Sequence, residues 1–89
     1  MKAVITVIGK DKVGIIAAVS KLLAEENINI LDITQTIMNE LFTMVMYTDI
    51  SKMKTDFASV SERLNALGKD MGLQILITHE DIYKSMHRI

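Results

Sequence analysis

The apolar residues of this chain change their periodicity several times, and the order of these changes constrains the fold more than any other feature. Residues 3–8 form a short run rich in β-branched side chains that ends at Gly9, which is typical of a buried strand. From Ile15 to Glu26 the apolar residues recur at helical spacing, and Asn27 suits the left-handed position that ends such a helix. The predicted apolar stripe consists of Ile15, Ile16, Val19, Leu22 and Leu23.

Two further strands are predicted in the middle of the chain. Residues 29–38 and 42–50 alternate between apolar and polar side chains, and Asn39-Glu40 between them fits a two-residue hairpin connection. Met44 and Met46 share one face of the second of these strands, and we expect both in the core. The centre of the chain therefore predicts a β-hairpin.

The last third repeats the change from helix to strand. Residues 56–71 carry an apolar stripe at spacings of three and four, and Gly72 follows as a helix stop. Residues 73–78 predict a fourth strand, and residues 80–89 predict a short helical tail. The stripe consists of Phe57, Val60, Leu64, Leu67 and Met71, and the apolar residues of the tail are Ile82, Met86 and Ile89.

The resulting order is β-α-β-β-α-β. Two helices with one apolar face each must cover the same face of a four-stranded antiparallel sheet. With right-handed crossovers this gives an α+β, ferredoxin-like βαββαβ sandwich, with the first and third strands in the middle and the second at an edge. We expect one domain at residues 1–79, a tail at residues 80–89, and an exposed helix-free face of the sheet.

Composition excludes several classes of function. Ten Lys and Arg against 11 Asp and Glu leave a net charge of −1 with no basic stripe, which disfavours direct nucleic-acid binding. No apolar stretch approaches the roughly 20 residues that span a bilayer, and no signal peptide precedes the first strand. We therefore expect a cytoplasmic protein. With 89 residues and no cysteine, the remaining way to add buried area is a partner subunit, so we expect a homodimer.

Catalytic and metal-binding patterns are also missing. Gly9 and Gly14 have the spacing of a phosphate-binding loop, but Ile15-Ile16 stand where a lysine and a hydroxyl residue would be needed. His79 and His87 are eight positions apart and cannot chelate one ion from a shared helix face, so solvated histidines are expected. We predict no enzyme activity, no metal and no cofactor.

The first loop carries the most informative motif. Residues Gly9-Lys10-Asp11-Lys12-Val13-Gly14-Ile15, followed by Asn27-Ile28-Asn29-Ile30, give the pattern G-x-D-x-x-G-[ILV], an amphipathic helix and N-I. In this the chain resembles the ACT domain, a small regulatory module that binds amino acids in metabolic enzymes and regulators. The resemblance covers residues 2 to about 78 and is strongest to stand-alone ACT proteins related to the glycine cleavage system repressor. Val13 departs from the family, which often has proline there.

The resemblance implies a small amino acid ligand, such as glycine or serine, held by Asp11, Val13, Gly14, Ile15 and Asn29. The free N–H groups at the start of the first helix favour a carboxylate, and Gly14 permits close approach to the backbone. Asp11 could accept hydrogen bonds from an ammonium group, and the Asn29 amide can donate or accept. These groups together complement a zwitterion.

Structural roles explain the same residues, and two functions stay open. Asp11 could cap the first helix, Gly14 could serve packing, and Asn29 could satisfy backbone groups. One hypothesis is a non-enzymatic regulatory ACT domain that binds its ligand at a subunit interface and relays this to a regulated protein partner. The alternative is a ligand-free dimerisation or protein-interaction module that uses the apolar tail.

Overall fold

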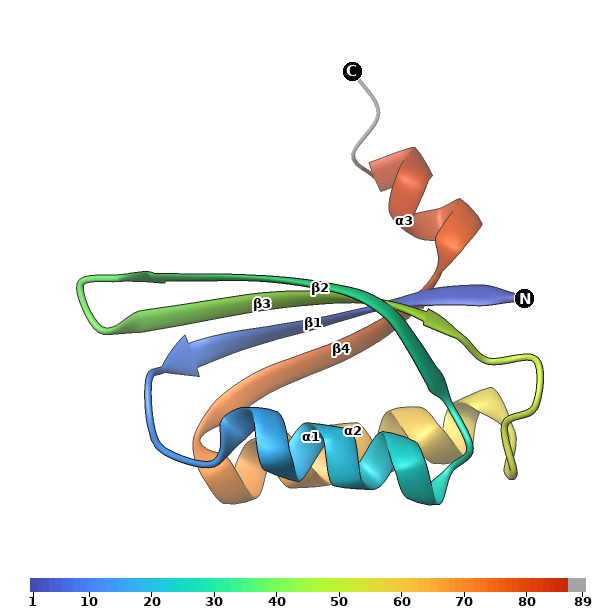
Figure 1. Ribbon diagram of the computed structural model, residues 1–89, viewed down its shortest axis with the longest axis horizontal. Coiled ribbons are helices and arrows are strands. Elements are labelled where there is room, and N and C mark those ends of the chain that lie inside the picture. Colours follow the sequence, from blue (N-terminus) through green and yellow to red (C-terminus); the bar gives the residue numbers. More distant parts are fainter. Residues whose placement is uncertain (87–89) are drawn as a thin grey trace.

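The computed structural model describes residues 1–86, and it confirms the βαββαβ order with a further helix at the C-terminal end (Figure 1). The elements, in chain order, are β1 (Lys2–Lys10), α1 (Ile15–Glu25), β2 (Asn29–Met38), β3 (Leu41–Asp49), α2 (Phe57–Met71), β4 (Leu73–His79) and α3 (Glu80–Met86). Of the residues predicted to build the tail, Ile89 lies outside the described residues, as does His87.

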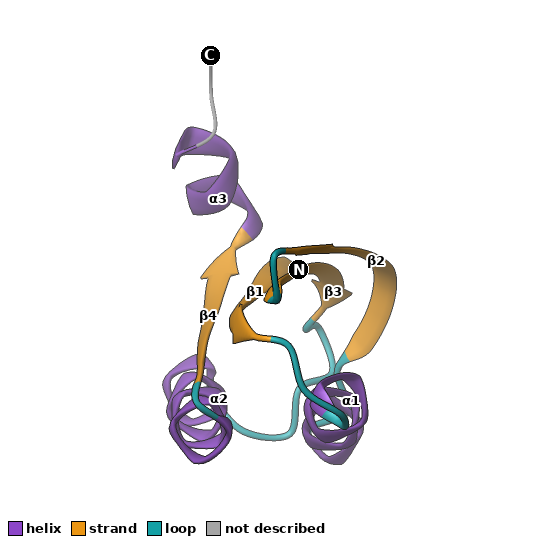
Figure 2. Ribbon diagram, turned by 90° about the vertical axis from the view of Figure 1, so that its left-hand side faces the viewer, coloured by secondary structure: helices purple, strands orange, loops and turns teal. Residues whose placement is uncertain are grey.

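The four strands form one sheet in the order β2-β3-β1-β4, with antiparallel pairing between all neighbours. As predicted, β1 and β3 are central and β2 is an edge strand. Figure 2 shows α1 and α2 against one face, with α1 towards β2 and α2 below β4, whereas α3 projects on the other side. The ferredoxin-like sandwich is therefore confirmed.

The core lies between the sheet and the two long helices. Met44 and Met46 are completely buried, as predicted, and both stripes of helical spacing contribute buried residues. The fully buried side chains from the sheet and the two helices include Ile5, Val7, Val19, Leu23, Val60 and Leu64. Each helix thus covers the sheet with the face that its apolar spacing indicates.

The prediction that Ile16 belongs to the buried stripe was wrong, because its side chain is 41% exposed. The buried positions of α1 are Ile15, Val19, Leu22 and Leu23, which repeat at intervals of four, three and one. Ile16 follows Ile15 by about 100° around the helix and so points away from the sheet. An apolar side chain is left on the outer flank of α1.

Two glycines let β4 approach its neighbours closely. A Cβ at Gly9 of β1 would lie 2.6 Å from Cδ2 of Leu73, and a Cβ at Gly68 of α2 would lie 2.7 Å from the Leu73 carbonyl oxygen. Real Cβ contacts are not this short, so a side chain at either position would displace its neighbour. Gly9 is therefore explained by packing at the start of β4.

The predicted chain reversals are confirmed by their backbone angles. Asn27 ends α1 with a φ of 58°, and Gly72 ends α2 with a φ of 70°. The β2–β3 connection is Asn39-Glu40, with φ values of 51° and 70°. Positive φ at both residues matches the right-handed twist of a hairpin.

α3 covers one end of the helix-free face. The Tyr47 hydroxyl of β3 donates a hydrogen bond to the Glu80 carboxylate, and Lys84 Nζ lies 2.9 Å from Glu80 Oε1. Val4 of β1 pairs with Tyr47 of β3 and lies on the same face of the sheet, and its side chain is buried. The expectation of an exposed helix-free face therefore holds only away from α3. Among residues 1–86, no helix is long and apolar enough to cross a membrane.

Candidate functional site

The β1–α1 loop holds three of the five predicted site residues, and a fourth, Ile15, is the first residue of α1 at the same end of the molecule. Gly14, with a φ of 93°, is the residue directly before α1, and no side chain caps the helix there. The capping role considered for Asp11 is therefore wrong; its backbone N–H instead donates to the Glu40 carbonyl oxygen at 2.8 Å. Val13 is 99% exposed, whereas Ile15 is buried in the core.

This arrangement leaves the start of α1 open to a ligand. The first N–H groups of a helix have no partner within the helix, and here no side chain of the chain accepts from them as a cap. The helix dipole adds partial positive charge at the same point. The exposed Asp11 carboxylate stands a few residues before it. The loop can thus offer donors to a carboxylate and an acceptor to an ammonium group.

Asn29 lies at the opposite end of α1. The helix has 11 residues, which corresponds to about 16 Å. Asn29 begins β2 opposite Asp49, whereas the loop end of the sheet pairs Lys10 with Leu41 (Figure 1). A small amino acid cannot span this distance, so one chain does not bring Asp11 and Asn29 into contact with the same ligand.

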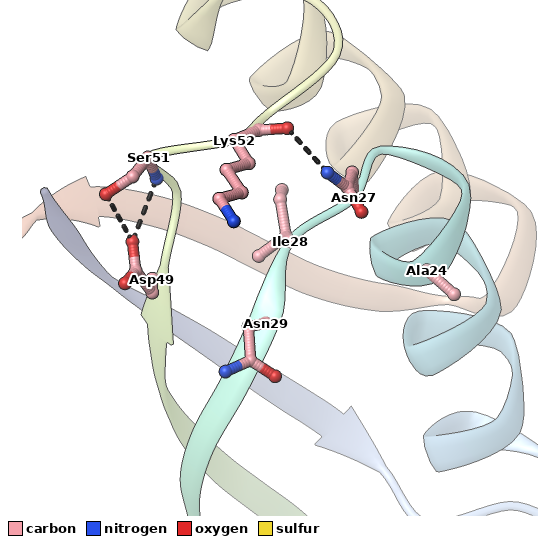
Figure 3. A pocket seen from close by; sticks show the side chains of 7 residues that line it. All are labelled: Ala24, Asn27, Ile28, Asn29, Asp49, Ser51 and Lys52. Carbon is pink, nitrogen blue, oxygen red and sulfur yellow. Dashed lines mark hydrogen bonds between the residues drawn. The ribbon is translucent and has the colours of Figure 1, made fainter.

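The surroundings of Asn29 form an open pocket of about 550 Å³ (Figure 3). Three segments build it: the end of α1 with its turn, the start of β2, and the end of β3 with the residues that follow. The lining residues are Ala24, Asn27, Ile28, Asn29, Asp49, Ser51 and Lys52. Most of these side chains are polar, so the pocket suits a polar ligand.

One charged group of the pocket is occupied by the protein itself. Asp49 Oδ1 accepts hydrogen bonds from the Ser51 N–H at 2.9 Å and from Ser51 Oγ at 2.6 Å. These bonds lower the pKa of Asp49 to about 2. Asp49 Oδ2 also lies 3.6 Å from Lys2 Nζ. The carboxylate is ionised at neutral pH and already has a counter-charge.

An ion pair between the buried Glu26 and the partly exposed Arg63 lies next to the segments that build the pocket. Arg63 Nη1 of α2 donates to Glu26 Oε2 at 2.8 Å, and the Thr55 hydroxyl donates to Glu26 Oε1 at 2.8 Å. Glu26, directly after α1, is 3% exposed, and these two hydrogen bonds lower the pKa of its carboxyl. The backbone N–H of Lys54 also donates to the Glu26 carbonyl oxygen. The turn after α1, the segment after β3 and α2 are thereby joined.

The histidine prediction can be examined only at His79. Its ring stacks on Phe57 with centroids 4.1 Å apart, so it packs against α2 rather than standing free in solvent. Within residues 1–86, no group of three or more potential ligands is placed to hold a metal ion.

Comparison with known proteins identifies the family. The sequence matches the ACT domain family over residues 2–78. This chain belongs to the ACT domain family. It is 58% identical over 89 residues to the UPF0237 protein of Clostridium acetobutylicum, with 100% of both chains covered. It is 53% identical over 88 residues to the UPF0237 protein of Methanocaldococcus jannaschii, with 99% of this chain and 98% of that relative covered.

Solved structures agree with this assignment. An ACT domain protein from Streptococcus pneumoniae has a TM-score of 0.81 and 43% identity, with 94% of each chain covered. A protein described as a glycine cleavage system transcriptional repressor has a TM-score of 0.70 and 26% identity, over 86% of this chain and 44% of that one. The regulatory subunit of aspartate kinase from Thermus thermophilus has a TM-score of 0.64 and 26% identity, over 85% of this chain and 49% of that one. The ACT fold is thus shared with regulatory proteins.

Sequence analysis missed the residues that surround Asn29. Asp49 ends β3, and Ser51 and Lys52 follow it in the sequence D-I-S-K, which matches no ligand motif. The signal that could have found them is the hairpin register. In an antiparallel pair, the start of one strand lies opposite the end of the other, so Asn29 must face Asp49.

Proposed function

We propose that this chain is a non-enzymatic regulatory ACT module that binds a small amino acid, such as glycine or serine, between two copies of itself. In this proposal, one copy contributes the loop with Asp11, Val13, Gly14 and Ile15, and the second contributes Asn29. The ligand favours the paired state because it contacts both chains, and a protein partner reads that change. The proposed site of action is the cytoplasm.

The observation that carries the proposal is the position of the two half-sites at opposite ends of α1, beside an open sheet edge. β2 ends the sheet, and α1 lies towards the same side of the molecule (Figure 2). In a symmetric dimer, the same surface of both copies is in contact. When two copies meet along β2 about a two-fold axis normal to the sheet, their α1 helices run antiparallel. The start of α1 in one copy then lies near the end of α1 in the other. Both half-sites are completed at once.

The same edge has the character of an interface. Its outer strand has unpaired backbone groups, which favour pairing with another strand. Exposed apolar side chains also gather along β2 and on the flank of α1, namely Leu31, Ile33, Ile37 and Ile16. Burial of these side chains would add the apolar area that a core of this size lacks.

The test is a thermal-shift screen of the purified protein with each of the twenty amino acids, alongside light scattering. A ligand at 100 times its dissociation constant that binds only the folded state adds about 2.7 kcal/mol. We expect one small amino acid to raise the melting temperature and the dimer fraction together. Asp11→Ala and Asn29→Ala should each weaken this response.

Mixing these two variants distinguishes a shared site from a site within one chain. In a mixed dimer, the copy with Asn29→Ala supplies an intact Asp11 and the copy with Asp11→Ala supplies an intact Asn29. One of the two sites is then restored, and binding should return at up to half the wild-type stoichiometry. A mixture that binds no better than either variant alone would contradict a site between copies.

The second candidate, a ligand-free interaction module, is favoured by α3. Ile82 and Met86 are both more than half exposed on this helix. If no amino acid shifts the melting temperature and Asp11→Ala and Asn29→Ala are neutral, this candidate replaces the first. Removal of residues 80–89 should then weaken assembly, and an unchanged oligomeric state would contradict a role for α3.

A further inference from the structure

We propose that Lys52 recognises the carboxylate of the bound amino acid. This inference rests on the proposed function, and it adds a specificity residue that neither the ACT motif nor the pattern of the loop includes. The pocket around Asn29 contains both a carboxylate, Asp49, and an ammonium, Lys52 (Figure 3). The two groups differ in whether other residues of the protein already form hydrogen bonds or ion pairs with them.

Asp49 is satisfied from within the chain. Its Oδ1 accepts two hydrogen bonds from Ser51, and Lys2 Nζ lies 3.6 Å from Oδ2. Lys52 Nζ, by contrast, makes no ion pair or hydrogen bond with any residue in the range 1–86. The Asn29 amide is likewise without a partner in that range. The groups left available in the pocket are therefore a cation and an amide, which together favour an anionic oxygen pair.

The backbone that carries Lys52 is held at three points. Its carbonyl oxygen accepts from Asn27 Nδ2 at 3.0 Å, and the next residue, Met53, donates its N–H to the Ile50 carbonyl oxygen at 3.2 Å. The N–H of Lys54 donates to the Glu26 carbonyl oxygen at 3.0 Å. Asn27, which holds Lys52, is itself fixed in a left-handed turn. The base of the Lys52 side chain is thus fixed at the pocket while its ammonium is free.

The ligand class follows from this pairing. A free carboxylate can accept from the Lys52 ammonium and the Asn29 amide, and its remaining lone pairs can accept from the open N–H groups of α1 in a second copy. An amine without a carboxylate, or an amino acid whose carboxyl is an amide, lacks this contact. The site should therefore select free α-amino acids over their amides.

The matched variants are Lys52→Met and Lys54→Met. Both remove one positive charge from the same segment, and Lys54 does not line the pocket. Isothermal titration with the amino acid found in the screen should give a dissociation constant about tenfold or more higher for Lys52→Met, because a charge-assisted hydrogen bond is lost. Lys54→Met should stay close to the wild type. The melting temperatures of the unliganded variants report that both are folded.

The amide of the same amino acid, for example glycinamide for glycine or serinamide for serine, completes the test. The wild type should bind the amino acid more tightly than its amide, and Lys52→Met should lose most of that preference. Equal weakening in both Met variants, or an unchanged preference in Lys52→Met, would overturn the role of Lys52 and leave the proposed function standing. No binding of any amino acid by the wild type would overturn both.

Discussion

The backbone N–H of Asp11 donates a 2.8 Å hydrogen bond to the carbonyl oxygen of Glu40. This bond joins the β1–α1 loop to the tip of the β2–β3 hairpin, two segments that the sequence separates by nearly a third of the chain. Since α1 begins directly after Gly14 without a capping side chain, this bond is one of the contacts that position the loop. The geometry of the proposed half-site thus depends on the hairpin turn.

Replacement of Glu40 by glycine should stabilise the protein. Glu40 has a φ of 70°, where a Cβ is strained, and glycine adopts this angle without that strain. The hairpin would then have the preferred Asn-Gly turn, and we expect a gain of about 0.5–1 kcal/mol in the free energy of unfolding. Urea unfolding measures this change in the free energy of unfolding. Glu40→Ala, which keeps the Cβ, is the control, and an equal gain there would contradict the explanation.

Replacement of Gly68 by alanine should destabilise the protein, although alanine is the better helix former. The new Cβ would lie 2.7 Å from the Leu73 carbonyl oxygen and 3.3 Å from Ile75 Cγ1, so α2 must move away from β4. We expect a loss of about 1–3 kcal/mol from overpacking, against about 1 kcal/mol of propensity gained. Thermal unfolding by circular dichroism measures the balance. A net rise in melting temperature would show that α2 can shift without cost.

Replacement of Arg63 by methionine should lower the melting temperature at pH 7 and have less effect in acid. The Arg63 hydrogen bond is the main cause of the lowered pKa of Glu26, whose ordinary value is 4.5. A carboxyl whose pKa falls on folding stabilises the protein above its unfolded pKa, and this stability is lost as the pH falls through the folded pKa. Without Arg63, the main cause of the lowering is lost, so the pKa of Glu26 rises towards its ordinary value and the carboxyl gains its proton at a higher pH than in the wild type.

The measurement is the melting temperature of both proteins between pH 7 and pH 3. The difference in melting temperature between the two proteins should shrink below about pH 4.5, because Glu26 becomes protonated there and has no charge for a cation to balance. Glu25→Gln is the control, because Glu25 is the exposed partner of Arg63 at 2.7 Å and exposed pairs contribute little. A difference that does not depend on pH would mean that Arg63 acts by packing alone.

Replacement of Tyr47 by phenylalanine should release α3 while the sheet stays intact. The Tyr47 hydroxyl donates to the Glu80 carboxylate, and this bond both raises the pKa of Tyr47 and lowers that of Glu80. Without it, amide hydrogen exchange over residues 80–86 should accelerate by roughly an order of magnitude, as expected for a short helix with few tertiary contacts. The amides shared by β1 and β3 serve as the internal reference. Unchanged exchange in α3 would show that another contact holds it.

The fold could be predicted from the sequence because each helix, strand and turn is indicated by residues that are close together in the chain. The apolar stripe of α2, the Gly72 stop and the Asn39-Glu40 turn each predict one element, and right-handed crossovers leave one arrangement of them. The prediction for Ile16 was wrong because this residue is next to the buried Ile15 in sequence but lies about 100° away from it around α1. The extent to which α3 covers the sheet also could not be predicted, because it depends on a contact between Tyr47 and Glu80.

Only part of the candidate site could be predicted from the sequence. The motif of the β1–α1 loop is contiguous, so Asp11 and Gly14 could be singled out by the resemblance to the ACT domain. That Asn29 stands at the far end of α1, beside Asp49 and Lys52, is a property of the hairpin register and of the turn after α1. The buried Glu26 was not noticed for a similar reason, since its partners Arg63 and Thr55 come from distant segments.

The separation of the two half-sites by the length of α1 also determines how such a protein would respond in a cell. If each complete site needs two chains, the amount of amino acid that triggers a response depends on the abundance of the protein as well as on its affinity. A cell could then adjust the sensitivity of the sensor through expression alone. The same dependence predicts that the apparent affinity falls when the purified protein is diluted.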